Sequence, residues 1–210
     1  MIEITPEAAE LLNYLHRGGA HCYYWLGDTK QTIWFPAGQP PKLPTNRNVY
    51  FGIHPASSKG TASERSKVET VSAINCLFAE FDAKDFEDNK AAALDHIQAL
   101  QLLPSVVVDS GGGYHCYWLL VEPVHLTNKD AREVIKRLQA EWVIYTGGDP
   151  GAKDLARVLR IPDTINTKYK PPRPVSIVWA DYDMPYELGE FDAILAAAAK
   201  NNPPKPTKSN

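Results

Sequence analysis

The first hydrophobic positions of the chain have the spacing of a helix. Thr5-Pro6 supplies a capping hydroxyl and a proline at the first helical position, and Gly18-Gly19 ends the pattern. Between them, apolar residues recur every three or four positions and define one face. The residues on that face are Ala8, Leu11, Leu12 and Leu15. We therefore expect a short helix with one buried side at the start of the chain.

Short apolar runs bounded by turn residues predict a series of strands. Their ranges are 21–26, 32–35, 48–53, 75–81, 102–108, 116–121 and 175–179. The first two are rich in aromatic residues and are separated by Gly27-Asp28, which predicts a hairpin. Ser110 and the glycines 111–113 join two later runs, and they predict a glycine turn because glycine takes positive φ at low cost.

Three further segments have helical periodicity. Asp88 is expected to cap a helix that runs through Leu100, with Leu94, Ile97 and Leu100 on one face. Thr127-Asn128-Lys129-Asp130 has the pattern of a capping box and opens another helix. Its expected buried stripe is Val134, Ile135, Leu138 and Trp142. A last helix is expected over 187–199.

The order of these elements predicts an α/β (α+β) fold. From 75 to 146 they read strand, helix, strand, strand, helix, which is the order of a split β-α-β unit, so an RRM-like or ferredoxin-like sheet is expected there. A chain of this length favours one domain, assigned to 1–200. The polar, proline-rich end, 201–210, is typical of a linker, which suggests that the natural protein continues.

Composition limits the classes of function. The chain is 44% hydrophobic and 22% charged, the balance of a globular protein, and no apolar stretch approaches a membrane span or a secretory signal, so the cytoplasm is expected. Cys22, Cys76 and Cys116 are widely separated and predict buried thiols, without a disulfide framework or zinc site. The net charge of −3 gives no global basic surface, so polynucleotide contact would need a local patch.

Glu80 and Asp82 are two residues apart at the end of a predicted strand, so both project from one face. Paired carboxylates repel each other unless a cation lies between them, and Mg²⁺ and Mn²⁺ prefer oxygen ligands. The alternative is a solvated strand end. Asp149 is the third acidic candidate, and Asp154 competes with it, although Asp154 could instead cap a helix.

Basic residues follow the third acidic candidate. Arg157 and Arg160 would share a face if the segment were helical, and Lys168 comes after a turn. With the glycine turn and His115, these donors favour a triphosphate site, because arginine binds phosphate bidentately and bare amides can cradle an anion. The polar loop 57–67 is either a surface loop or a cationic flap over a phosphate ligand.

Three segments in order carry a family resemblance: FAEFD, SGGGYHCYW and GDPGAKDLARVLRIPDTINTK. They resemble the motifs of the archaeo-eukaryotic primase superfamily, and most of all its RepB-like branch in plasmid and phage replication proteins. The likeness covers roughly 48–168. It implies a two-lobed fold, with an RRM-like catalytic half (73–180) packed on an N-terminal α/β half (1–72) and followed by a C-terminal helix (181–200).

The resemblance also implies site residues and partners. Metal-binding, catalytic carboxylates that hold Mg²⁺ or Mn²⁺ would be Glu80, Asp82 and Asp149. Nucleotide-binding positions would be Ser110, Gly112, Gly113, His115, Arg157, Arg160 and Lys168. The implied activity is that of a DNA primase or polymerase, which uses NTP or dNTP and a single-stranded or primed DNA template, with a helicase or helical accessory domain farther along. Two positions depart from the pattern: Glu80 where aspartate is commoner, and Asp163 where glycine is usual.

Two other functions are compatible with parts of the chain. A non-catalytic RRM-like module would bind single-stranded nucleic acid through exposed Tyr114, Tyr117 and Trp118, although clustered carboxylates would repel the phosphate backbone. A metal-dependent initiator nuclease would need a histidine pair and a nucleophilic tyrosine. His54 and His96 are far apart in the sequence, which disfavours that chemistry.

Overall fold

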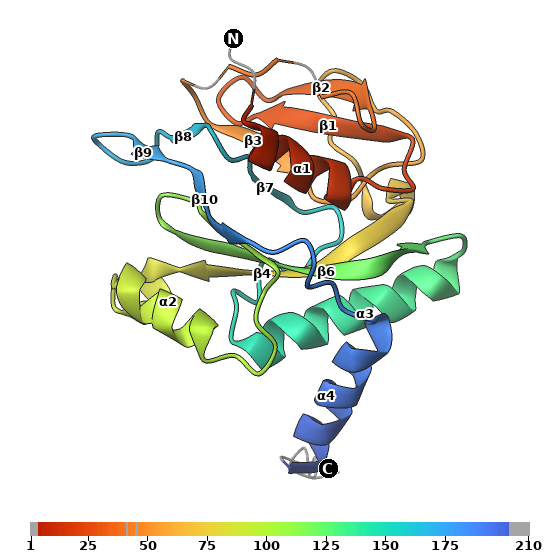
Figure 1. Cartoon of the computed structure of the whole chain (residues 1–210). Helices are drawn as coiled ribbons and strands as arrows, with labels where there is room; N and C mark the ends of the chain where they lie inside the picture. The colour runs from red at the N-terminus through yellow and green to blue at the C-terminus, as the bar shows by residue number, and fades with distance from the viewer. Residues whose placement is uncertain (1–3, 41, 45, 202–210) are drawn as a thin grey trace, which may run out of the picture.

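The computed structural model describes residues 4–40, 42–44 and 46–201. Two four-stranded antiparallel sheets lie one above the other, and α2 and α3 cover the far side of the lower sheet (Figure 1). The upper sheet has the order β2-β1-β3-β7, with bounds Gln31–Pro36, His21–Leu26, Val49–Gly52 and Val158–Arg160. The lower sheet has the order β10-β5-β6-β4, with bounds Ser176–Ala180, Val106–Asp109, Gly113–His125 and Ala73–Asp82.

The remaining elements join or cover these sheets. The α-helices are α1 Pro6–Leu15, α2 Lys90–Gln98, α3 Lys129–Thr146 and α4 Leu188–Asn201. Short pieces are the 3₁₀ turns η1 Val68–Thr70 and η2 Ala83–Phe86, and the two-residue strands β8 Ile165–Asn166 and β9 Arg173–Pro174. In the part of the chain that the structure describes, none of the helices is long and apolar enough to cross a membrane.

The predicted α/β class and the split β-α-β unit are confirmed. Strand β6 lies between β4 and β5, which are joined by α2. Strand β7 pairs with β3, so the chain returns to the upper sheet after α3. The proposed division into lobes at residues 72 and 180 stays a prediction. The expected linker falls on 202–210, outside the described residues, except Asn201, which ends α4.

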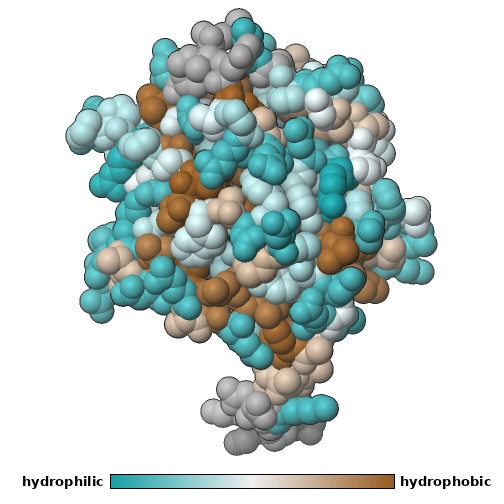
Figure 2. Space-filling view, in the orientation of Figure 1, coloured by the Kyte–Doolittle hydropathy of each residue, from teal (hydrophilic) through white to brown (hydrophobic). Residues whose placement is uncertain are grey.

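Two hydrophobic clusters lie on opposite faces of the lower sheet. One lies between the sheets and includes the apolar face of α1 with Phe51, Phe78 and Tyr117. The other lies between the lower sheet and the helices and includes Trp118 and Trp142. Hydrophobic residues reach the surface where α4 meets the body (Figure 2), and there Phe191 packs edge-on against Trp142 at 4.7 Å between ring centroids. The three cysteines are buried and free, as expected.

Three local expectations need correction. Asn89, and not Asp88, is the N-cap of α2, because its side chain accepts from the amides of Ala91 and Ala92 while Asp88 has a positive φ of 59°. Within the expected capping box at 127–130, Asn128 and not Thr127 is the N-cap of α3, because its side chain accepts from the amide of Ala131. Val134 is 53% exposed and does not belong to the buried stripe of α3.

Candidate active site

The three predicted carboxylate residues lie together at the end of β4. Glu80 and Asp82 occupy one face of the strand, and the Asp149 amide donates to the Glu80 carbonyl oxygen at 2.9 Å. Gly147 ends α3 with φ +74°, and Gly148 passes so close that a Cβ there would lie 2.9 Å from that of Ala79. The glycine pair therefore lets the chain turn back tightly and place Asp149 beside Glu80. We call these three residues the acidic edge.

Each carboxylate of the acidic edge has a partner within the protein. Arg157 Nε lies 2.6 Å from Glu80 Oε1, Lys84 Nζ lies 2.9 Å from Asp82 Oδ2, and Asp149 Oδ1 accepts from the Gly151 amide at 2.8 Å. Burial raises the pKa of Glu80, whose side chain is only 14% exposed. Arg157 opposes that rise, while the charges of Asp82 and Asp149 add to it.

Carboxylate oxygens are the donors that Mg²⁺ and Mn²⁺ prefer, so the chemistry of the acidic edge fits a hard divalent cation. Among the described residues, however, no group of three or more histidine, cysteine, aspartate or glutamate side chains is placed to hold a metal ion. The three carboxylates therefore do not form a ready set of metal ligands. A cation at this edge would have to replace Lys84 at Asp82 and Arg157 at Glu80. Metal binding here therefore stays a prediction.

The glycine turn between β5 and β6 forms as predicted, with Gly111 at φ +83°. Its polar groups already have partners. The Gly111 amide donates to Asp109 Oδ1 at 2.7 Å, and the buried Ser110 hydroxyl donates to the Gly113 carbonyl at 3.1 Å. The Gly111 amide of the expected cradle is therefore engaged in the turn itself, and a phosphate would reach Ser110 only if its hydroxyl exchanged partners.

His115 lies against the acidic edge, with its Nε2 3.9 Å from Glu80 Oε2. Its ring is 3% exposed, and Nδ1 has no hydrogen-bond partner among the described residues. Burial lowers the pKa of His115 to about 3, and the charges of Arg160 and Arg157 contribute. The imidazole is therefore neutral at neutral pH, so any phosphate contact it made would be a hydrogen bond without a full charge.

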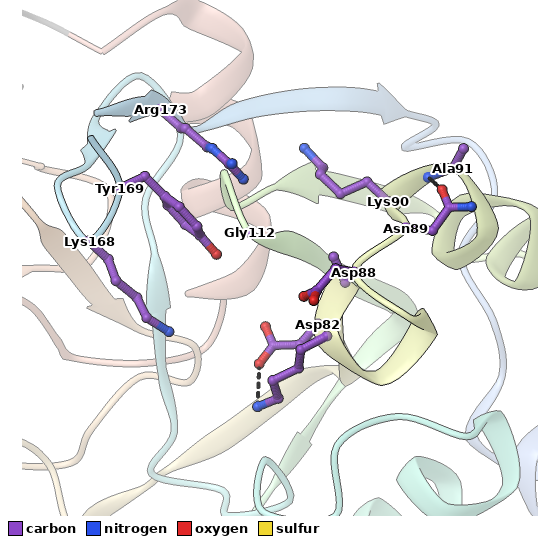
Figure 3. Close-up of a pocket in the computed structure, with 11 residues that line it drawn as sticks. Asp82, Asp88, Asn89, Lys90, Ala91, Gly112, Lys168, Tyr169 and Arg173 are labelled. Atoms are coloured by element: carbon purple, nitrogen blue, oxygen red, sulfur yellow. Dashed lines mark hydrogen bonds and ion pairs between the residues drawn. The ribbon is translucent and has the colours of Figure 1, made fainter. Parts of the chain in front are cut away.

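A large pocket of about 920 Å³ opens beside Asp82. Figure 3 shows Lys168, Tyr169 and Arg173 along one side of it and the start of α2 on the other. Its cationic side chains are Lys84, Lys90, Lys168 and Arg173. We call this the cationic pocket. Gly112 also lines it, so the structure brings Lys168, Gly112 and Asp82 of the predicted set to one cavity.

Among the residues that line this pocket, sequence reasoning missed the basic and aromatic side chains of Lys84, Lys90, Tyr169 and Arg173. Arg173 lies over the ring of Tyr169, 3.8 Å from the ring centroid to the guanidinium carbon. The signal for these two was the basic run from Lys168 to Arg173, which continues directly from the third motif. Lys84 was visible as a cation two residues after Asp82.

Arg160 ends β7 and Arg157 lies directly before that strand, so the suggested helix is wrong. The segment pairs with β3, where Arg160 is opposite Tyr50. Arg157 contacts Glu80, whereas Arg160 Nη2 donates to the Tyr50 hydroxyl at 2.9 Å and its guanidinium lies over that ring. The two arginines therefore contact different partners, and neither lines the cationic pocket.

The structure explains the aspartate at the usual glycine position. Asp163 has φ +65°, a conformation in which glycine is favoured and aspartate is tolerated. Its carboxylate accepts from the Thr5 amide at 2.8 Å, at the start of α1. The Asp163 carboxylate therefore joins the third motif to the N-terminal end of α1.

Two further candidates lie apart from the cationic pocket. Asp154 accepts from the Ala156 amide in a turn, and no helix follows, so its expected role as a helix cap is wrong. The loop 57–67 folds over the upper sheet, where Arg65 lies over the ring of Trp25, and its cations line a separate hollow of about 110 Å³. This placement favours a surface loop over a flap on the cationic pocket.

The structure disfavours both alternative functions, the RRM-like binding module and the initiator nuclease. Tyr117 and Trp118 are fully buried and Tyr114 is 7% exposed, so they form no platform for bases on the surface. His54 packs on Phe78 between the sheets, whereas His96 bonds the Thr146 carbonyl on the helix side. The two histidines therefore do not form a nuclease pair.

Comparison with known proteins gives one sequence relative and several structures. A replication protein of Clostridium perfringens is 26% identical over 130 residues, which is 60% of this chain but only 31% of that protein. No family model matches. The AEP domain of the cyanophage S-2L primase-polymerase superposes with a TM-score of 0.58 at 18% identity, over 89% of this chain and 93% of that domain. The catalytic domain of primase RepB′, solved with initiator DNA, gives 0.45 at 15% identity over 93% of both chains.

Proposed function

The chain has the fold of an archaeo-eukaryotic primase domain, and from this premise we propose that it is a template-directed nucleotidyltransferase of a replication protein, a DNA primase or DNA polymerase. The observation that carries the proposal is the position of the acidic edge beside the cationic pocket. Carboxylates and phosphate-binding cations on adjoining surfaces are what transfer of a nucleotidyl group requires.

In this proposal the acidic edge, Glu80, Asp82 and Asp149, binds Mg²⁺ or Mn²⁺. When bound, such an ion activates the attacking 3′-hydroxyl and offsets the charge that develops on the leaving pyrophosphate. Lys84 pairs with Asp82 and Arg157 pairs with Glu80, so these two bases occupy the positions from which a cation would contact the carboxylates. His115 lies opposite Glu80 on the neighbouring strand, and Arg157 holds the Glu80 side chain through its hydrogen bond.

The cationic pocket binds the triphosphate of the incoming NTP or dNTP. Its volume of about 920 Å³ is within the usual range of sites for small ligands and cofactors. Lys168 and Arg173 approach from the β8–β9 hairpin, and Lys90 approaches from α2 (Figure 3). Lysine and arginine on opposite walls neutralise the phosphates from two sides. Ser110, Gly113 and Arg160 belong to the nucleotide site only if they rearrange when the nucleotide binds.

The remaining partners belong to the whole replication protein. A single-stranded or primed DNA template is the second substrate, since the reaction copies a strand. The sequence match spans less than a third of the Clostridium perfringens protein, so a helicase or helical accessory domain beyond this chain is part of the proposal.

Primer extension with a matched pair of variants tests the proposal. Asp82→Asn keeps the shape of the side chain and removes its charge, and Asp95→Asn makes the same change at an exposed position of α2. We expect Asp82→Asn to lower nucleotide incorporation by at least about a hundredfold, because even outer-shell changes at metal sites cost up to that much. Asp95→Asn should match the wild type. Equal activity in all three proteins would refute the assignment of the acidic edge.

A further inference from the structure

The loop 57–67 is held against the upper sheet by hydrogen bonds at its neck and at its tip. At the neck, the Ser57 amide donates to the Thr70 carbonyl at 2.8 Å, and the Ser57 hydroxyl donates to the same oxygen at 3.2 Å. At the tip, Trp34 Nε1 of β2 donates to the Thr61 carbonyl at 3.2 Å. These bonds give the loop a defined shape over the sheet.

The hollow of about 110 Å³ at this loop, which we call the loop hollow, has an excess of positive charge. Its cations and hydroxyl groups come from Lys59, Arg65, Lys67, Ser58, Ser66 and Thr70. In the part of the chain that the structure describes, none of the three cations forms an ion pair with a carboxylate. Glu64 also lines the hollow, and its carboxylate accepts from the Thr61 amide within the loop at 3.2 Å. Three cations thus face one carboxylate that the loop itself engages.

An aromatic ring positions Arg65. Its guanidinium carbon lies 4.9 Å from the centroid of the Trp25 ring, and Lys30 Nζ lies 4.7 Å from the same centroid. A cation over a ring keeps its full charge, because the ring supplies no counter-charge. The guanidinium group has five N–H donors in a planar fork that fits the oxygens of a phosphate. Trp25 therefore holds a cation at the hollow without neutralising it.

The size of the hollow limits what it can hold. Its volume is well below the roughly 300–1,000 Å³ of sites for whole drug-sized ligands, whereas the cationic pocket, at about 920 Å³, is within that range. Arginine and lysine bind phosphate oxygens through charge-assisted hydrogen bonds, and hydroxyl groups can donate to the same oxygens. We propose that the loop hollow binds one phosphate group, at a site that shares no lining residue with the cationic pocket in the described structure.

Two sources could supply this phosphate group, a free phosphate ion or the backbone of a single-stranded nucleic acid. The chain has a net charge of −3, so any contact with a polynucleotide needs a local basic patch, and the loop provides one. The site would bind phosphate whether or not the chain extends a primer.

Trp34 provides a spectroscopic probe of the site, because its indole N–H donates into the loop. The indole N–H resonance, assigned with Trp34→Phe, is followed by NMR in isotope-labelled protein. One titration uses inorganic phosphate, and a second uses a short thymidine oligonucleotide with hydroxyl groups at both ends. We expect a saturable shift with at least one of these ligands. Arg65→Gln should raise the Kd for that ligand by about tenfold, the size of one lost charge-assisted hydrogen bond.

Arg137→Gln is the matched control, since it makes the same change at a side chain of α3 that is 73% exposed and lies outside the loop. It should leave the Kd unchanged. A shift with phosphate that Arg65→Gln weakens identifies a site for the free ion, and a shift with the oligonucleotide alone that Arg65→Gln weakens identifies a site for a strand.

Three results would overturn the assignment of the loop hollow. In the first, neither ligand shifts the Trp34 resonance. In the second, sodium chloride at the same ionic strength shifts it as far as either ligand does. In the third, Arg65→Gln and Arg137→Gln bind with the same Kd. None of these results would bear on the nucleotidyltransferase activity proposed above, which primer extension tests separately.

Discussion

Two faces of the same strand pair, β4 and β6, have opposite chemistry. On the helix side the pair presents Phe81, Cys116 and Trp118, which pack into the cluster beneath the sheet. On the side toward the upper sheet it presents Glu80 and His115, both largely buried. Strand residues alternate between faces, so one segment of sequence builds a hydrophobic core and a polar site at once. Both faces contribute to a hydrophobic cluster, and the side toward the upper sheet also carries these polar groups at the end of β4.

Both faces have buried polar atoms without hydrogen-bond partners. In the described part of the chain they include the Tyr117 hydroxyl and His115 Nδ1 on the side toward the upper sheet, and Trp142 Nε1 on the helix side. Each such atom costs about 1–3 kcal/mol relative to a satisfied one. What sets the side toward the upper sheet apart is that His115 lies 3.9 Å from Glu80 and that burial shifts the pKa of both groups, since perturbed ionisable groups that lie together indicate function.

The largest expected effect is on stability, from the helix side. Trp118 is fully buried, packs edge-on against Trp142 at 5.2 Å and donates to the Leu102 carbonyl. Trp118→Ala should lower the free energy of unfolding by about 3–5 kcal/mol. Glu80→Gln, on the opposite face, should lower it by less than about 1 kcal/mol because the amide oxygen still accepts from Arg157. Urea unfolding of both variants measures the contrast, and equal losses would contradict it.

The next effect concerns the ion pair between Arg157 and Glu80. Arg157→Met leaves a buried carboxylate without its guanidinium, so we expect a loss of about 2 kcal/mol. Adding Glu80→Gln removes the uncompensated charge, and the double variant should lose less than the sum of the two single changes. A double-mutant cycle in urea unfolding measures this. Strict additivity would show that the pair is not coupled in solution.

Acid should destabilise the region between the sheets. Burial lowers the pKa of His54 to about 3, and the charge of His16 adds to this, while the unfolded value is near 6.5. Above about pH 6.5 both states are neutral. As pH falls below that value, the unfolded chain gains a proton that the folded chain does not, so stability falls by up to about 1.4 kcal/mol per pH unit. His54→Leu should reduce the slope of unfolding free energy between about pH 6 and 4 by that amount. An unchanged slope would contradict the burial of the neutral ring.

The smallest effect is expected at Asp163. Asp163→Gly relieves a positive φ but removes the acceptor of the Thr5 amide, and these opposing terms should leave the unfolding free energy within about 1 kcal/mol of the wild type. The KM for nucleotide should not change, because the carboxylate points to α1. A marked fall in that KM would instead place the aspartate beside the phosphates.

The hydrophobic pattern predicted those helices and strands whose structure is determined by nearby residues in the sequence. The apolar runs of β4 and β6 and the start of α3 could be read from the sequence, because each depends on residues within a turn or a strand. Strand β7 could not, since three residues pair with β3 only through the tertiary fold. Val134 was assigned to the core because its position fits the helical period, yet it is 53% exposed in the described structure.

The sequence predicted where the carboxylates of the candidate site lie better than it predicted the contacts of the basic side chains. The juxtaposition of Asp149 with Glu80 followed from the resemblance of the three segments to known motifs, and the structure confirms that the two residues are neighbours. The partners of Arg157, Arg160 and Lys168 could not be predicted, because long flexible side chains choose among acceptors that come from distant segments. Tyr50 and Arg173 became visible only once the sheets and the hairpin were placed.

One measurement tests the central claim most directly. The chain is incubated with a 5′-labelled DNA primer annealed to a longer template, with dNTP and Mn²⁺, and the products are separated by length. The account predicts a ladder of extended products that follows the template sequence and that disappears in Asp82→Asn. A primer that is shortened, or that is bound but unchanged in length, would contradict it.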